Sequence, residues 1–135
     1  MIGSEREVKW SPFMEHHLLR NQVYIHYAHP KDWVIEKKTF FKPAVGSTEK
    51  YITPDARFTR NGVTHYLEVD RTQSMSQNKL KIEEYKEISP LIEISEGHKP
   101  VIVWFTARNS RVDKLKKWCK EAGLNCEVHS FEDLR

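Results

Sequence analysis

The dipeptide Asn61-Gly62 constrains the fold of this chain more than any other feature of its sequence. It separates two segments with strand character, residues 51–59 and 63–70. Asn-Gly is the strongest short signal for a two-residue hairpin, because both residues accept the positive φ of a type I′ turn. In that turn Arg60 pairs with Val63, and all further pairs have residue numbers with the same sum. The two-residue turn therefore predicts the register of the whole hairpin, whereas a loop of three to five residues around positions 59–62 would shift the pairing.

This register places two carboxylates opposite each other, those of Asp55 and Glu68. Side chains alternate between the faces of a strand, so the pairing also predicts which residues share a face. The face that carries the acids holds Asp55, Arg57, Tyr66, Glu68 and Asp70. The opposite face holds Ala56, Phe58, His65, Leu67 and Val69, and we expect it to face the core.

Directly opposed acids require a compensating cation, because like charges with Cβ atoms about 4.5–5.5 Å apart destabilise a sheet. One interpretation is a bound Mg²⁺ or Mn²⁺, ions that prefer oxygen ligands. Such an ion activates water and stabilises the charge that develops on a phosphodiester. The other interpretation is a solvated strand face on which Arg57 and nearby lysines compensate Asp55 and Glu68.

The remaining segments predict helices on both sides of this hairpin. Ser11-Pro12 opens a helix, with serine as N-cap and proline in the first turn, and His29-Pro30 ends it. Further helices are expected from residue 74 or 75 to 89, before Pro90, and over 110–122. Further strands are expected at 32–38, 101–105 and 124–128, with a loop at 41–50. The order α-β-β-β-α-β-α-β predicts an α/β (α+β) fold, a central mixed sheet flanked by helices.

Composition restricts the class of protein without defining its function. The length of 135 residues predicts a single domain at 11–135, and the polar start of the sequence predicts a flexible N-terminus at 1–10. No apolar run reaches the roughly 20 residues of a membrane helix, and the first residues do not resemble a signal peptide. Two cysteines, Cys119 and Cys126, indicate a reduced, cytoplasmic compartment. A net charge of +3 permits an anionic partner without requiring one.

The hairpin acids resemble a known nuclease signature. Thr53-Pro54-Asp55-Ala56, the thirteen residues from Asp55 to Glu68, and Glu68-Val69-Asp70 resemble the PD…(D/E)xK signature of the restriction-endonuclease-like superfamily. The core of that superfamily is αβββαβ, which the expected order contains. The resemblance implies that Asp55 and Glu68 are metal ligands for Mg²⁺ or Mn²⁺. It also implies a third acid on the first helix, for which Glu15 is the candidate.

More narrowly, the chain resembles the replication-relaxation family of bacterial plasmids and other mobile elements. The likeness spans about residues 13–105. Its points are Glu15-His16-His17-Leu18, Trp33, Glu36, Pro54-Asp55-Ala56, Glu68-Val69-Asp70-Arg71 and a following helix that carries lysine and tyrosine. This resemblance implies DNA as a partner, together with other replication or transfer proteins.

One position departs from the signature. Asp70 stands where a lysine would hold or polarise the attacking water, and it becomes an additional candidate metal ligand. Some relatives carry that cation on the following helix, where Lys81 lies four residues before Tyr85 on the same helical face. Lys79 is the other candidate for this catalytic role. The alternative is that both lysines belong to the solvated face of the helix.

Three functions follow from these patterns. The first is a DNA-processing domain with Mg²⁺-dependent endonuclease activity at Asp55, Glu68 and one of the two lysines. The second is a non-catalytic DNA-binding or relaxosome-accessory module on a degenerate nuclease fold. The third is a protein-interaction module whose acids are ordinary surface. Tyr51 and Tyr66 are candidates either for stacking on bases or for packing, and His17 is a candidate neighbour of the acids.

Overall fold

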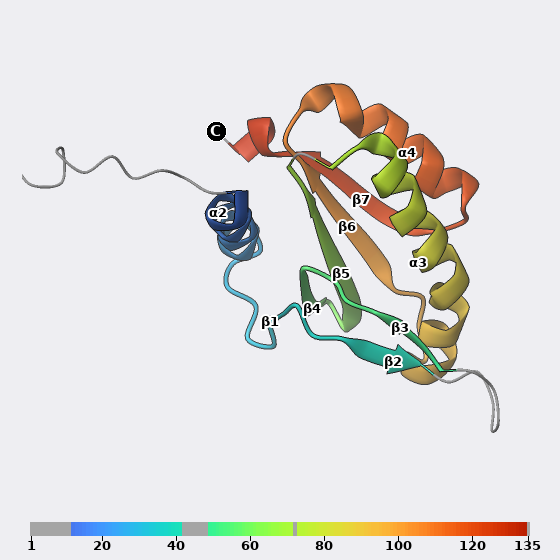
Figure 1. Ribbon diagram of the computed structural model, residues 1–135. Helices are drawn as coiled ribbons and strands as arrows, with labels where there is room; N and C mark the ends of the chain where they lie inside the picture. Colours follow the sequence, from blue (N-terminus) through green and yellow to red (C-terminus); the bar gives the residue numbers. More distant parts are fainter. Residues whose placement is uncertain (1–11, 42–48, 72, 135) are drawn as a thin grey trace, which may run out of the picture.

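A five-stranded mixed sheet with helices on both faces forms the body of the protein (Figure 1). The computed structural model describes residues 12–41, 49–71 and 73–134. Helix α2 (Pro12–His26) lies on one face of the sheet. Helices α3 (Met75–Glu96) and α4 (Val112–Glu121) lie on the other. The predicted fold class, a mixed sheet flanked by helices, is confirmed.

The main sheet has the strand order β1-β4-β5-β6-β7. Its strands are β1 (Val34–Ile35), β4 (Ala56–Arg60), β5 (Val63–Asp70), β6 (Val101–Thr106) and β7 (Asn125–Ser130). β4 is antiparallel to both β1 and β5, whereas β5, β6 and β7 run parallel. A separate two-stranded sheet consists of β2 (Thr39–Phe41) and β3 (Lys50–Ile52). The 3₁₀ helices η1 (Asn109–Arg111) and η2 (Phe131–Leu134) precede α4 and follow β7.

The β4–β5 hairpin has the register that its turn predicts. Arg60 pairs with Val63 and Arg57 with Tyr66. Asn61 and Gly62 have φ values of 54° and 78°, as a type I′ turn requires. Regular pairing ends at Ala56, but the amide of Asp55 still donates to the Leu67 carbonyl at 2.9 Å. Asp55 is therefore held against β5.

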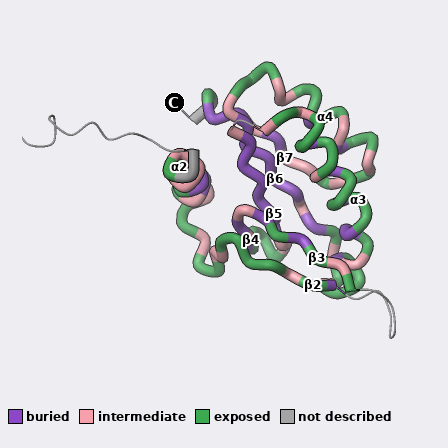
Figure 2. Tube along the Cα trace, in the orientation of Figure 1, coloured by how far each residue is buried: buried purple, intermediate pink, exposed green. Residues whose placement is uncertain are grey.

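Both faces of β5 are buried, contrary to the prediction of one core face (Figure 2). Leu67 and Val69 join a core cluster with Val23 of α2. Tyr66 joins a second cluster beneath α3 and α4. Between these helices and the sheet, Glu68 is 5% exposed and Asp70 is 0% exposed. The cause is the parallel pairing of β5 with β6, since helices cover both faces of parallel strands.

This burial also corrects the interpretation of the acids as a solvated strand face, because neither Glu68 nor Asp70 faces solvent.

The strand predicted at 51–59 is two strands in different sheets. β3 pairs with β2 and ends at Ile52, and β4 begins at Ala56. Between them, Pro54 has no amide hydrogen for a sheet ladder. The predicted loop at 41–50 thus borders a hairpin, and its residues 42–48 lie outside the described part of the chain, as do the Ser11 cap and residues 1–10. The strand predicted at 32–38 is reduced to Val34–Ile35.

Helix α3 continues through Pro90 to Glu96, so the predicted end at residue 89 is wrong. Proline removes one backbone hydrogen bond from a helix interior. Here Pro90 is exposed, while Ile88 and Ile92 pack into the core on either side of it. This packing outweighs the local cost. The helix begins at a Ser74–Gln77 capping box, and among the described residues no helix is long and apolar enough to cross a membrane.

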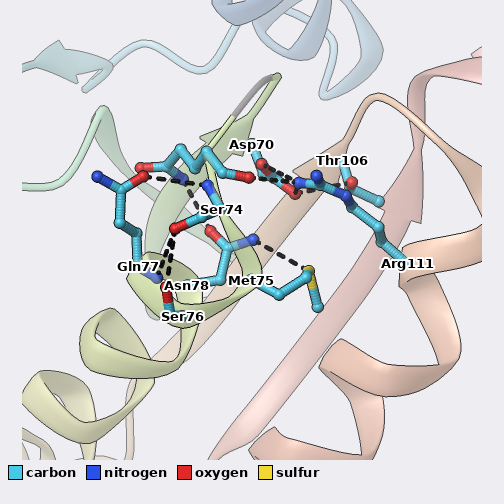
Figure 3. A network of polar contacts seen from close by, with 9 residues as sticks. Asp70, Ser74, Met75, Ser76, Gln77, Asn78, Thr106 and Arg111 are labelled. Carbon is cyan, nitrogen blue, oxygen red and sulfur yellow. Dashed lines mark hydrogen bonds and ion pairs between the residues drawn. The ribbon is translucent and has the colours of Figure 1, made fainter.

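The carboxylate of Asp70 ties β5 to β6 and to the start of α4 (Figure 3). Thr106 Oγ1 donates to Asp70 Oδ2 at 2.9 Å. Arg111 Nη1 lies 2.9 Å from both Asp70 oxygens and also donates to the Gln73 carbonyl at 2.7 Å. Asp70 is thus a buried, compensated charge that links three elements and the segment leading into α3.

Removal of this carboxylate should destabilise the fold. Breaking a buried ion pair costs about 3–5 kcal/mol, and the partial exposure of Arg111 reduces this for Asp70→Ala to about 2–4 kcal/mol. Asp70→Asn should lose less, because an amide oxygen still accepts one bond. Urea unfolding monitored by circular dichroism measures both. Glu83→Ala, an exposed change on α3, is the control and should stay within about 0.5 kcal/mol. A loss in Asp70→Ala no larger than in this control contradicts the structural role.

Candidate functional site

Of the acidic pair predicted from the hairpin, Asp55 immediately precedes β4 and Glu68 lies near the end of β5. Glu68 is buried beneath α3, while the Asp55 side chain is partly exposed. Burial and the nearby Asp55 charge together raise the pKa of Glu68 well above its ordinary value. The two carboxylates therefore interact, and Glu68 carries a strong preference for a proton or another cation.

Helix α3 directs two side chains at Glu68 from successive turns. Tyr85 donates its hydroxyl to Glu68 Oε2 at 2.5 Å. Lys81 Nζ lies 3.9 Å from Glu68 Oε1 and 3.6 Å from Glu84 on its own helix. Burial and the neighbouring Glu68 charge raise the pKa of Tyr85 well above its usual range, so Tyr85 stays a hydrogen-bond donor. Residues four apart share a helix face, which explains why both reach one carboxylate.

Helix α2 brings a histidine to Asp55. His16 Nε2 lies 3.1 Å from Asp55 Oδ1, and the hydrogen bond to Asp55 raises the pKa of His16. The other oxygen of Asp55 accepts a bond from the Val69 amide at 2.6 Å. The histidine predicted beside the acids was His17, but the contact belongs to His16. His17 instead accepts a hydrogen bond at Nδ1 from Arg20, which also pairs with Glu36 at 3.2 Å.

Three other predicted site residues are engaged elsewhere. Glu15 pairs with Arg71 at 2.6 Å. Asp70 is bound by Arg111 and Thr106. Lys79 lies over the indole ring of Trp118, 5.0 Å from its centroid, on the side of α3 that faces α4. Of the two candidate lysines, Lys81 is thus the one that the structure places at Glu68.

The predicted metal set of Asp55, Glu68, Asp70 and Glu15 does not converge. Within the described ranges, no group of three or more histidine, cysteine, aspartate or glutamate side chains forms a metal-holding cluster. The physical reason is that Asp70 pairs with Arg111 and Glu15 pairs with Arg71. What remains is a two-carboxylate site.

The chemistry of this pair fits a hard divalent cation. Mg²⁺ keeps several waters and is commonly bound by one or two carboxylates, completed by substrate phosphates. Each ionised carboxylate offers about four lone-pair positions. On Asp55, one lone-pair position of each oxygen accepts a hydrogen bond. On Glu68, Oε1 lies 3.9 Å from Lys81 Nζ. Lone-pair positions that could bind a metal ion therefore remain on both Asp55 and Glu68.

Fold and site together define an α+β domain with an acidic pair, buried Glu68 and partly exposed Asp55, that is contacted by a lysine, a tyrosine and a histidine. No protein-family model and no curated protein matches the sequence.

Two of the contact residues had no predicted role in the site. Tyr85 was named from the sequence only because its spacing from Lys81 places both on one helical face. For His16 the sequence offers no equivalent signal, because the choice between adjacent histidines depends on how α2 is rotated against the sheet.

The metal-free protein should become less stable as pH rises. Between 4.5 and its raised pKa, Glu68 holds a proton in the folded state that it lacks when unfolded, so stability is lost across this interval. His16, raised above 6.5, adds a loss in the same direction as pH rises through its folded pKa. Lys81, Tyr85, Glu84 and Asp55 are the groups that face Glu68.

Glu68→Gln should remove the larger part of this slope and raise the melting temperature at about pH 8 by a few degrees in EDTA. Thermal unfolding from about pH 5 to pH 8 measures this effect. Glu83→Gln, exposed on the same helix, should follow the wild-type slope. An unchanged slope in Glu68→Gln contradicts the buried, raised carboxyl.

Proposed function

We propose that this chain is a DNA-processing domain of a plasmid or mobile-element replication-relaxation protein, and that it cleaves phosphodiester bonds with Mg²⁺ or Mn²⁺ held by Asp55 and Glu68. The observation that carries the proposal is the position of Lys81, 3.9 Å from the buried Glu68 carboxylate. It supplies the cation that the signature lacks at Asp70. Such a protein acts on DNA in the cytoplasm.

The arrangement of the elements supports the proposal. Apart from the β2–β3 sheet, the order α2-β1-β4-β5-α3-β6 is αβββαβ, the order of the restriction-endonuclease-like core.

Several of the points of resemblance, scattered along the sequence, contact one another in space. His16 contacts Asp55, and Glu15 pairs with Arg71. The Glu36 amide donates to the Asp55 carbonyl at 3.2 Å. Two of the matched positions, His16 and Glu36, therefore contact Asp55 directly.

Each residue at the site has a distinct task in this proposal. A bound metal would supply Lewis-acid stabilisation of the phosphate and a more acidic water. Lys81 holds a positive charge beside Glu68, where it can orient that water or a phosphate oxygen. Tyr85 fixes the rotamer of Glu68 through its hydroxyl, and His16 together with the Val69 amide fixes that of Asp55. Burial of Glu68 keeps bulk water away from one side of the pair.

A second candidate is a non-catalytic DNA-binding or relaxosome-accessory module. Two observations favour it. Both oxygens of Asp55 already accept hydrogen bonds from protein groups. The residue in the signature lysine's place, Asp70, is committed to a buried ion pair with Arg111. A fold that had lost catalysis could keep these contacts for stability alone.

Nicking of supercoiled plasmid in Mg²⁺ or Mn²⁺ separates the two functions. Asp55→Ala and Glu68→Ala should reduce the rate at least about 100-fold, because each removes a metal ligand. Lys81→Met should cost about 10²–10³-fold by loss of the oriented charge. Lys79→Met is the matched control, a lysine two positions away that contacts Trp118, and should keep the wild-type rate.

A protein that shifts DNA in a salt-sensitive manner but cuts it with neither metal contradicts the catalytic proposal and supports the binding module. A protein that does neither leaves the interaction module as the remaining function.

A further inference from the structure

Two large aromatic side chains lie side by side on the exposed face of the β2–β3 sheet. Phe40 is 51% exposed and Tyr51 is 56% exposed. They are directly paired across the two strands, with ring centroids 5.8 Å apart. Each of the two strands has one intermediate, one exposed and one buried residue, and Figure 2 shows this sheet by burial.

Their exposure follows from the alternation of the two strands. Phe41 and Ile52, the neighbours of this pair along the chain, are buried in the core cluster that includes α3. Since successive side chains point to opposite faces, Phe40 and Tyr51 must point away from α3. The buried residues hold the small sheet in place, as does an ion pair between Lys50 and Glu87 of α3. The exposed rings therefore lie on a small sheet that is packed against α3.

A lysine accompanies the rings. Lys38 Nζ lies 3.9 Å from the centroid of the Tyr51 ring and 5.5 Å from that of Phe40. We call Lys38, Phe40 and Tyr51 the aromatic platform. Ring faces combined with a cation form the surface that binds single-stranded nucleic acid, in which bases stack on the rings and a phosphate meets the charge.

A short chain segment and one hydrogen bond connect the aromatic platform to the strand that Asp55 immediately precedes. Tyr51 lies four residues before Asp55. Arg57 of β4 donates to Thr39 of β2 at 3.3 Å, which ties the small sheet to the strand that follows Asp55. Figure 1 shows β2 and β3 running from the β1–β4 side of the main sheet toward the C-terminal half of α3.

We propose that the aromatic platform binds unpaired bases of single-stranded DNA next to the acidic site. The bases stack on Phe40 and Tyr51 while Lys38 leaves the rings for a backbone phosphate. Duplex bases already stack on one another, so their faces are not accessible. An apolar protein partner would cover the rings but leave the Lys38 ammonium without a counter-charge, whereas a nucleotide supplies both a ring and a phosphate. This inference rests on the proposed function and names the form of DNA.

Binding of a labelled oligothymidine strand in EDTA tests the inference without cleavage. Fluorescence anisotropy should show Phe40→Ala and Tyr51→Ala each weakening binding about tenfold, and the double variant more. Tyr51→Phe, which keeps the ring, should bind as the wild type does. Lys38→Ala should lower the slope of log K against log salt by about 0.7. A strand of equal length without bases should bind the wild type as weakly as the oligothymidine binds the double variant.

Leu80→Ala and Ile94→Ala are the matched controls, because both remove an exposed apolar side chain from α3 instead of the small sheet, and both should bind normally. Three results overturn the inference: equal binding of the baseless strand by the wild type, wild-type affinity in the double variant, or no binding of single strands.

Asp55→Ala should keep base-dependent binding while it loses nicking. Base-dependent binding without any nicking would contradict only the proposed cleavage. Asp55-dependent nicking with an unaffected double variant would contradict only the aromatic platform.

Discussion

Burial of the Glu68 carboxylate beneath α3, beside the charge of Asp55, is the constraint on which the other features of the site depend. Removing an ionised carboxylate from water costs several kcal/mol unless other groups compensate it. In this protein the compensation is incomplete: a tyrosine hydroxyl at 2.5 Å and a lysine at 3.9 Å. Helix α3 brings Tyr85 and Lys81 to Glu68. Helix α2 brings His16 to Asp55.

Comparison of Glu68 with Asp70, two residues further along the same strand face, shows how environment separates their roles. Both carboxylates are buried. Asp70 receives a guanidinium and a hydroxyl, each at 2.9 Å, so its charge is fully paired and it links elements of the fold. In the part of the chain that the structure describes, no arginine pairs with Glu68, and the nearby Asp55 raises the pKa of Glu68 further. An acid that the fold leaves under-compensated is the one available to a metal or a substrate cation.

The sequence predicted those features that neighbouring residues determine, and it did not predict those that depend on contacts between distant segments. The Asn61-Gly62 turn is local, so it predicted the hairpin register and the approach of Asp55 to Glu68. The burial of both faces of β5 arises from pairing with β6, a long-range contact that no strand pattern encodes. Arg111, the partner of Asp70, lies 41 residues away. The choice of Lys81 over Lys79, and of His16 over His17, depends on the rotation of each helix against the sheet. The continuation of α3 beyond Pro90 likewise depends on tertiary packing, that of Ile88 and Ile92 in the core.

A crystal structure of the protein soaked in Mn²⁺, with anomalous diffraction data, tests the central claim most directly. The account predicts one anomalous peak within coordination distance of both Asp55 and Glu68, with its remaining ligands supplied by water, and loss of that peak in Asp55→Ala. The absence of a peak in the wild type, with Asp55 still bonded to His16 and the Val69 amide, would contradict it. So would a peak at Asp70 or Glu15 instead of the acidic pair.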